Sequence, residues 1–117
     1  MRFLQFFAPV EEINSPNRPE KQFNIRLNTV FDICERVDET KLNFAVTHQE
    51  IICDTICQFC FRLKTVEELS NFQRKYFDYS DYCFWITVAT KNSKMKVISL
   101  KNRDGIHKIT KKFMTSL

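Results

Sequence analysis

The sequence has 117 residues, a mass of 14.0 kDa and a net charge of +4 at pH 7. This length favours a single domain over residues 1–117, which is also a suitable size for the N-terminal interaction module of a longer protein. Glycine occurs once, at Gly105. Glycine-rich phosphate loops and dinucleotide-binding motifs need several residues without a Cβ atom, so both are excluded. No run of 18 apolar residues occurs, and we expect no membrane association.

The first 46 residues contain one clear helical pattern. Residues 1–13 mix apolar and polar side chains and predict a strand or a short docked arm. The proline-containing segment 14–20 predicts a loop. Apolar residues then recur at helical spacing from Phe23 to Cys34, which predicts a helix over residues 21–37. Residues 38–46 predict an extended connection.

A longer helical pattern follows this connection. Thr47 and Glu50 match a capping box, in which each side chain satisfies a backbone N–H group at the start of a helix. From Ile52 onwards the apolar residues repeat at alternating intervals of four and three, as in one seam of a coiled coil. We therefore predict a long central helix over about residues 48–75. Its apolar side supplies the candidate interface residues, namely Ile52, Ile56, Phe59, Leu63, Val66, Leu69, Phe72 and Tyr76.

The last third of the chain favours strands. Residues 82–90 are mainly β-branched and aromatic, and residues 95–101 are a plausible partner across the polar turn 91–94. These segments predict a C-terminal β-hairpin over about residues 82–101. Apolar residues at helical spacing from Ile106 to Phe113 predict a short basic helix after it. The predicted fold class is therefore α+β and mostly helical, with two or three helices.

Positive charge is concentrated at the C-terminal end. Residues 91–117 carry eight Lys or Arg and one Asp, whereas residues 1–90 carry ten Lys or Arg and thirteen Asp or Glu. Such a basic segment attracts phosphate backbones or acidic proteins. The alternative is a solvated, lysine-rich edge that opposes aggregation. The candidate nucleic-acid contacts are Lys94, Lys96, Lys101, Arg103, Lys108, Lys111 and Lys112.

Five cysteines are present, and three of them are clustered. Their odd number and the lack of a secretory leader favour reduced thiols in the nucleus or cytoplasm. Cys57 and Cys60 have the Cys-x-x-Cys spacing of zinc ligands, and Cys53 lies one helical turn earlier. A zinc site would need further ligands from a set comprising Cys34, Cys53, Cys83, His48 and His107. The alternative is that the cysteines pack in the core, so we expect no cofactor, with zinc as the exception.

The sequence gives little support for catalysis. Neighbouring carboxylates, such as Glu67 and Glu68, point in different directions on a helix and so do not form an acid/base pair. No nucleophile motif surrounds any cysteine. We therefore expect a protein without enzymatic activity and without a small-molecule substrate.

Residues 23–76 resemble a degenerate form of the insect zinc-finger-associated domain. The resemblance rests on the segment LNTVFDIC ending at Cys34, the link DETKLNFAV, and the segment IICDTICQFC. A helix with Leu63, Leu69 and Phe72 then follows, whereas the family's first cysteine pair has no counterpart here. The resemblance implies a nuclear dimerisation module of a DNA-associated regulator, in which long helices pair between subunits.

The leading functional prediction is a protein-interaction and homodimerisation module of a nuclear, chromatin- or transcription-associated protein. One alternative is a small viral or host adaptor protein that binds its partner as a monomer. Another is a zinc-dependent nucleic-acid-binding domain that uses Cys57, Cys60 and the basic segment. Within the leading prediction, the apolar seam either pairs between two subunits or packs against the 21–37 helix of the same chain.

Overall fold

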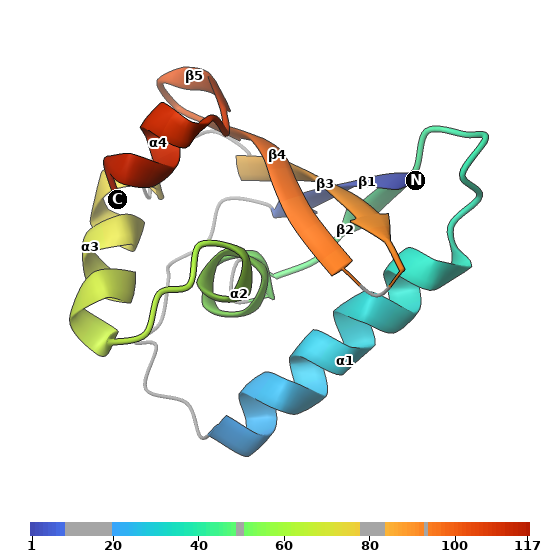
Figure 1. Ribbon diagram of the computed structural model, residues 1–117, viewed down its shortest axis with the longest axis horizontal. Helices are drawn as coiled ribbons and strands as arrows, with labels where there is room; N and C mark the ends of the chain where they lie inside the picture. Colours follow the sequence, from blue (N-terminus) through green and yellow to red (C-terminus); the bar gives the residue numbers. More distant parts are fainter. Residues whose placement is uncertain (9–19, 49–50, 78–83, 93) are drawn as a thin grey trace.

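A five-stranded mixed sheet forms one layer of the protein (Figure 1). The computed structural model describes residues 1–8, 20–48, 51–77, 84–92 and 94–117. The strands are β1 (Arg2–Ala8), β2 (Phe44–Val46), β3 (Phe84–Lys91), β4 (Lys94–Asn102) and β5 (Gly105–Lys108). Their spatial order is β2-β1-β3-β4-β5. The β1–β2 pair is parallel, and the other three pairs are antiparallel.

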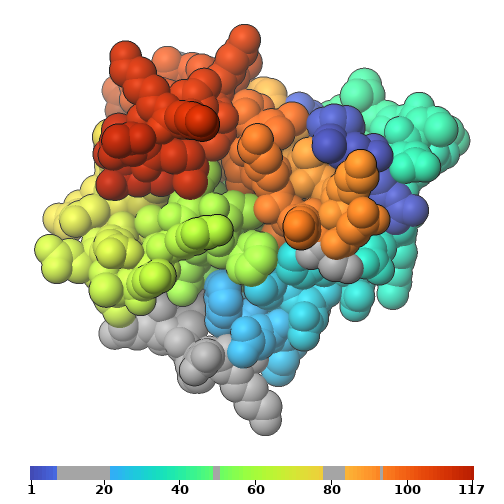
Figure 2. Space-filling model, viewed as in Figure 1, coloured from blue at the N-terminus to red at the C-terminus, as the bar shows by residue number. Residues whose placement is uncertain are grey.

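The helical segments form the second layer. They are α1 (Glu20–Arg36), the π-helical segment η1 (Ile51–Cys57), α2 (Gln58–Cys60), α3 (Val66–Tyr76) and α4 (Lys111–Thr115). In Figure 1, α1, α2 and α3 lie below and to the left of the strands. Figure 2 shows α4 (red) seated against α3 (yellow-green), where the rings of Phe113 and Tyr76 are 5.2 Å apart. The helix predicted over residues 21–37 is confirmed as α1.

Alternation along the strands gives the sheet two different faces. Side chains on a strand point alternately to opposite sides, so one set of positions faces the helices. That inner face is apolar and buried, and it includes Leu4, Phe6, Phe84, Ile86, Val88, Val97 and Leu100. The opposite, outer face carries Phe7, Trp85 and Lys101, which lie side by side on three neighbouring strands. The helices and the inner face together enclose one hydrophobic core.

The prediction of one long helix over residues 48–75 is wrong. Helix α2 ends at Cys60, and Arg62 adopts a left-handed backbone conformation with φ of 55°. The Leu63 N–H group donates to the Gln58 carbonyl at 3.0 Å, and the Arg62 N–H group donates to the Phe59 carbonyl at 3.4 Å. This pair of hydrogen bonds is the Schellman motif, which closes a helix.

A second cap starts the next helix. The Thr65 hydroxyl accepts a hydrogen bond from the Glu68 N–H group at 3.0 Å, and the Glu68 carboxylate accepts one from the Lys64 N–H group at 2.7 Å. Together they supply acceptors for two backbone donors at the start of α3. The continuous apolar pattern therefore spans two short helices with a sharp change of direction between them. Of the capping box predicted at Thr47, Gln49 and Glu50 lie outside the described residues.

The predictions of a mostly helical fold and of a C-terminal hairpin are also wrong. Strands β3 and β4 do pair, but β3 lies at the centre of the sheet between β1 and β4. Residues 82 and 83, which the prediction included, lie outside the described residues. The inner face of β3 is buried by the helices, so it belongs to the main core. Strand β1, for which the sequence allows either a strand or a docked arm, is the second neighbour of β3.

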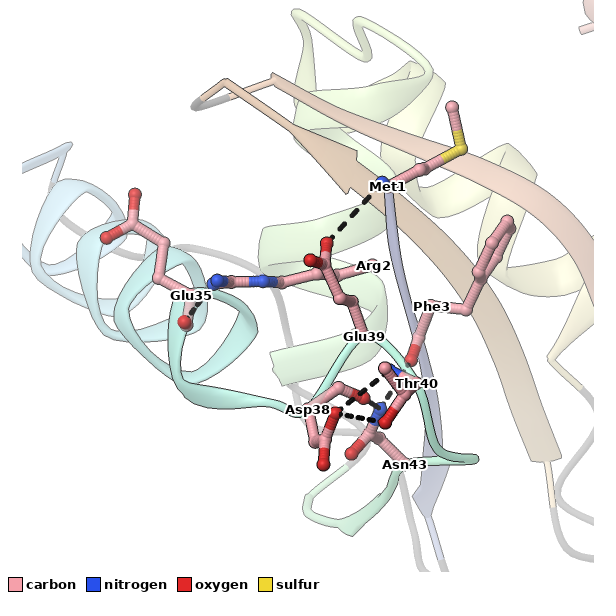
Figure 3. A network of polar contacts seen from close by, with 8 residues as sticks. All are labelled: Met1, Arg2, Phe3, Glu35, Asp38, Glu39, Thr40 and Asn43. Atoms are coloured by element: carbon pink, nitrogen blue, oxygen red, sulfur yellow. Dashed lines mark hydrogen bonds and ion pairs between the residues drawn. The ribbon is translucent and has the colours of Figure 1, made fainter.

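A polar network fixes the turn that leads into β2 (Figure 3). The Asn43 side-chain amide donates to the carbonyls of Phe3 at 3.2 Å, Asp38 at 2.9 Å and Lys41 at 2.9 Å. The Asp38 carboxylate accepts hydrogen bonds from the hydroxyl and the N–H group of Thr40, which lowers the pKa of that carboxyl. The network therefore ties the turn to the start of β1 and holds β2 beside it.

Candidate binding surfaces

The predicted interface seam mostly lies inside the core. Six of its eight side chains are buried: Ile52, Ile56, Leu63, Leu69, Phe72 and Tyr76. Phe59 and Val66 are the exposed members, at 39% and 55%. The Phe59 ring packs edge-on against Phe31 of α1 at 5.7 Å, as expected for a seam that packs within one chain. Packing within the chain therefore already uses most of the seam.

The clustered cysteines are buried thiols. Cys34, Cys53 and Cys57 are buried, and Cys60 is partly buried. Burial raises the pKa of Cys34 to about 11 and that of Cys60 to about 12. It also raises the pKa of Cys53 and Cys57 well above the ordinary value. These thiols therefore stay protonated at neutral pH, whereas metal binding and nucleophilic attack both use the thiolate.

The described residues provide no ligand set for the predicted zinc site. No group of three or more His, Cys, Asp or Glu side chains that could hold a metal ion is present among them. Cys83 lies outside the described residues. His107 is near Asn102 instead, with 3.0 Å between its Nε2 and the Asn102 Oδ1. The arrangement around Cys57 and Cys60 resembles hydrophobic packing more than a metal centre.

Slow alkylation of the thiols is the first testable prediction. At pH 8, raising a thiol pKa from 9.0 to about 11 reduces the thiolate fraction about 100-fold. Iodoacetamide should therefore label Cys34 at least about 100-fold more slowly in the folded protein than in urea. Peptide mass spectrometry after timed quenching measures each cysteine separately. Equal rates in the folded and unfolded protein would contradict this picture of the core.

A row of aromatic rings crosses the outer face of the sheet. The ring of Phe7 on β1 lies 5.8 Å from that of Phe44 on β2 and 5.8 Å from that of Trp85 on β3. On the next strand, the Lys101 ammonium lies 5.9 Å from the centre of the Trp85 ring. Phe7, Trp85 and Lys101 are directly opposite one another in the sheet register. Phe44 is opposite Gln5, two residues before Phe7, so its side chain is on the same face. The row therefore combines one side chain from each of four strands.

The predicted nucleic-acid residues lie in three parts of the structure. Lys94, Lys96 and Lys101 lie at exposed positions of β4, and Lys108 lies at an exposed position of β5. Register places Lys101 opposite Trp85 and Lys108 opposite Ser99, on the outer face. Lys111 and Lys112 belong to α4, in the helical layer, and Arg103 lies in the turn between β4 and β5. The structure therefore brings part of the predicted set to one face and does not gather all of it.

Strand β2 forms an apolar edge of the sheet. Leu42, Phe44 and Val46 are 85%, 59% and 79% exposed. Asn43 and Thr47 hydrogen-bond through their backbone to Gln5 and Phe7 of β1. In a parallel pair the intervening residues direct their backbone N–H and C=O groups away from the partner strand. The backbone groups of Phe44 and Val46 therefore point to the outside, where the described residues place no further strand. We call Leu42, Phe44 and Val46 the β2 edge.

One hollow of the surface does not assemble a catalytic group. It has a volume of about 580 Å³ and lies beside Phe31, Cys34 and Thr90. Two of the charged residues that line it have structural contacts: Arg2 donates to the Glu35 carbonyl, and Glu39 pairs with the Met1 ammonium at 3.7 Å. The described lining contains no histidine, and the Cys34 thiol there is protonated at neutral pH.

Comparisons with known proteins give no relative for this chain. No protein-family model matches it, and neither a curated protein nor a solved structure does. In the part of the chain that the structure describes, no helix has the length and apolar character needed to cross a membrane. The likeness to the zinc-finger-associated domain therefore stays a prediction from the sequence.

Proposed function

We propose that this chain is a non-enzymatic protein-interaction module that forms a homodimer through its β2 edge. The observation that carries the proposal is the exposure of three large apolar side chains beside backbone groups of β2 that no other described strand pairs with. Exposed edges template the addition of another strand, and soluble proteins usually protect them with lysine, proline or a bulge. Strand β2, with the sequence FAV, carries neither of those residues. A nuclear, chromatin-linked setting is part of this proposal and has only the sequence resemblance in its support.

A second copy of the chain is the occupant that we favour. Two β2 strands can pair antiparallel about a two-fold axis, which makes the same surface complementary to itself. Such pairing would satisfy the outward backbone groups of Phe44 and Val46 in both copies and bring their side chains beside those of the other copy. It would also extend each five-stranded sheet into a continuous sheet across the dimer. The buried seam needs no rearrangement in this arrangement.

The test is the mass of the protein in solution, measured by sedimentation equilibrium over a range of concentrations. The wild-type protein should approach twice the 14.0 kDa monomer mass. Val46→Lys places a charge at a 79% exposed edge position and should give a folded monomer. The matched control is Val66→Lys on α3, which is 55% exposed and belongs to the predicted seam. It should leave the dimer intact.

Three results would contradict the proposal. A wild-type monomer at every concentration would favour the adaptor that binds as a monomer. A dimer that persists in Val46→Lys would place the interface elsewhere. A dimer that is lost in Val66→Lys but kept in Val46→Lys would return the interface to the exposed side of the seam. Circular dichroism of each variant shows whether it is folded.

A further inference from the structure

We infer that the outer face of the sheet binds single-stranded nucleic acid, with bases against the aromatic row and phosphates beside the neighbouring lysines. This inference goes beyond dimerisation, because it uses side chains that stand out from the outer face of a single chain, whereas strand pairing uses the outward backbone groups of β2. Phe44 belongs to both surfaces. It also needs no zinc, unlike the nucleic-acid alternative from the sequence. The row consists of Phe44, Phe7 and Trp85, with Lys101 at its end.

The rings supply the surface on which bases can stack. Each neighbouring pair has its ring centres 5.8 Å apart, and the interplanar angles are 41° and 31°. Phe44 is 59% exposed, and Phe7 and Trp85 are partly exposed. Aromatic side chains on an open sheet stack with unpaired bases of any sequence, because every base has a π face. In a duplex these faces are covered by neighbouring base pairs, so the row favours single strands.

The strands supply charge of one sign. None of the residues in the five strands is Asp or Glu, although the chain has 14 such residues. The strands carry six Lys or Arg residues, and five of them are exposed lysines: Lys91, Lys94, Lys96, Lys101 and Lys108. Within the described residues, none of these five lysines forms an ion pair. Their charge is therefore available to a polyanion.

Charge and rings occur on the same face, which favours nucleic acid over a protein partner. Lys101 lies opposite Trp85, Lys96 lies opposite Ala89, and Lys108 is two strands away from Thr87 across Ser99. Protein interfaces usually have an apolar centre from which lysine is depleted. Single-strand binding surfaces instead combine stacking rings with a basic track along the backbone.

Fluorescence titration tests the inference at the site itself, because Trp85 is the only tryptophan of the chain. The probe is an oligothymidylate about 12 nucleotides long, which suits a surface of one small domain. At about 50 mM salt it should quench Trp85 saturably, with a slope of log K against log salt near −2 for three contacted phosphates. The duplex of the same length and polyglutamate are titrated in parallel.

Matched variants separate stacking from charge. Phe44→Leu removes the ring but keeps an apolar side chain at the β2 edge, and it should weaken binding about 10-fold with little change of salt slope. The double variant Lys96→Gln/Lys101→Gln should weaken binding and reduce the slope by about 1.4. Lys111→Gln/Lys112→Gln removes the same charge from α4 in the helical layer, and it should bind the probe through the same quench of Trp85 with only a small loss.

Several outcomes would overturn the inference. An absence of quenching by the oligothymidylate would do so, as would equal affinity for the duplex. Stronger binding of polyglutamate would identify an acidic protein as the partner of this face. A larger loss in the α4 variant than in the strand variant would move the binding site to the C-terminal helix.

Discussion

Raising the pH from 8 to 10 should lower the free energy of unfolding by about 5 kcal/mol, because four buried thiols ionise only when the protein unfolds. Burial holds the pKa of Cys34 at about 11 and that of Cys60 at about 12, and it also raises the pKa of Cys53 and Cys57 well above the ordinary value of 9.0. Above pH 9 the unfolded state has lost these protons and the folded state keeps them. The contribution of the protonated thiols to the free energy of unfolding is therefore fully present well below pH 9. It is lost as the pH rises from about 9 towards the pKa values of the folded protein.

Urea unfolding followed by Trp85 fluorescence at pH 8, 9 and 10 measures this effect. Each thiol contributes about 1.3 kcal/mol to the expected fall over this range. Cys34→Ala is the control: its stability at pH 8 is lower, because a buried side chain is shortened, but its fall from pH 8 to 10 should be smaller by that same amount. A free energy of unfolding that does not change up to pH 10 would show that the thiols are accessible to water.

Phe72→Ala should cost about 4 kcal/mol of stability, which is the usual loss for a fully buried phenylalanine. Phe72 is 3% exposed on α3. Its ring centre lies 5.2 Å from that of Phe61, 5.0 Å from that of Tyr76 and 5.7 Å from that of Phe77. Removing the ring leaves a cavity at the place where α3 meets the segment that follows α2. The expected loss is comparable with the whole stability of a small domain.

The matched control for Phe72→Ala is Val66→Ala on the same helix. Val66 is 55% exposed, so its truncation should change the free energy of unfolding by less than about 0.5 kcal/mol. Urea unfolding at pH 7 compares the two variants with the wild-type protein. Similar losses in both variants would mean that α3 is stabilised mainly by its own backbone. A small loss in Phe72→Ala would mean that the ring contacts of Phe72 contribute little to the free energy of unfolding.

Short-range patterns predicted the individual elements better than their arrangement. Helix α1 and the strand segments β3 and β4 were found because their apolar residues follow helical or extended spacing over many residues. The break at Arg62 was missed because the spacing of apolar residues stays regular on both sides of it. The Thr65–Glu68 capping box was the available signal for the start of α3, and it was overlooked.

The outer face could be predicted only in part. Its lysines were found from the basic composition of residues 91–117. The aromatic row was missed because Phe7, Phe44 and Trp85 come from distant parts of the chain, and only the strand register places them on one face. A local pattern carries no information on which strands are neighbours. The burial of six seam residues was foreseen only as one of two alternatives, since an apolar helix face looks the same inside a core or between subunits.

The position of β1 inside the sheet has a consequence for biosynthesis. This strand leaves the ribosome before the other four strands, yet residues 2–8 pair with residues 84–90, which are made much later. Contacts so distant in sequence close slowly, because a large loop must be ordered before they form. During translation, the side chains of Phe3, Phe6 and Phe7 therefore stay without the antiparallel strand β3 until that strand has been synthesised. We expect the nascent chain to be a client of ribosome-associated chaperones until the second half of the protein has been synthesised.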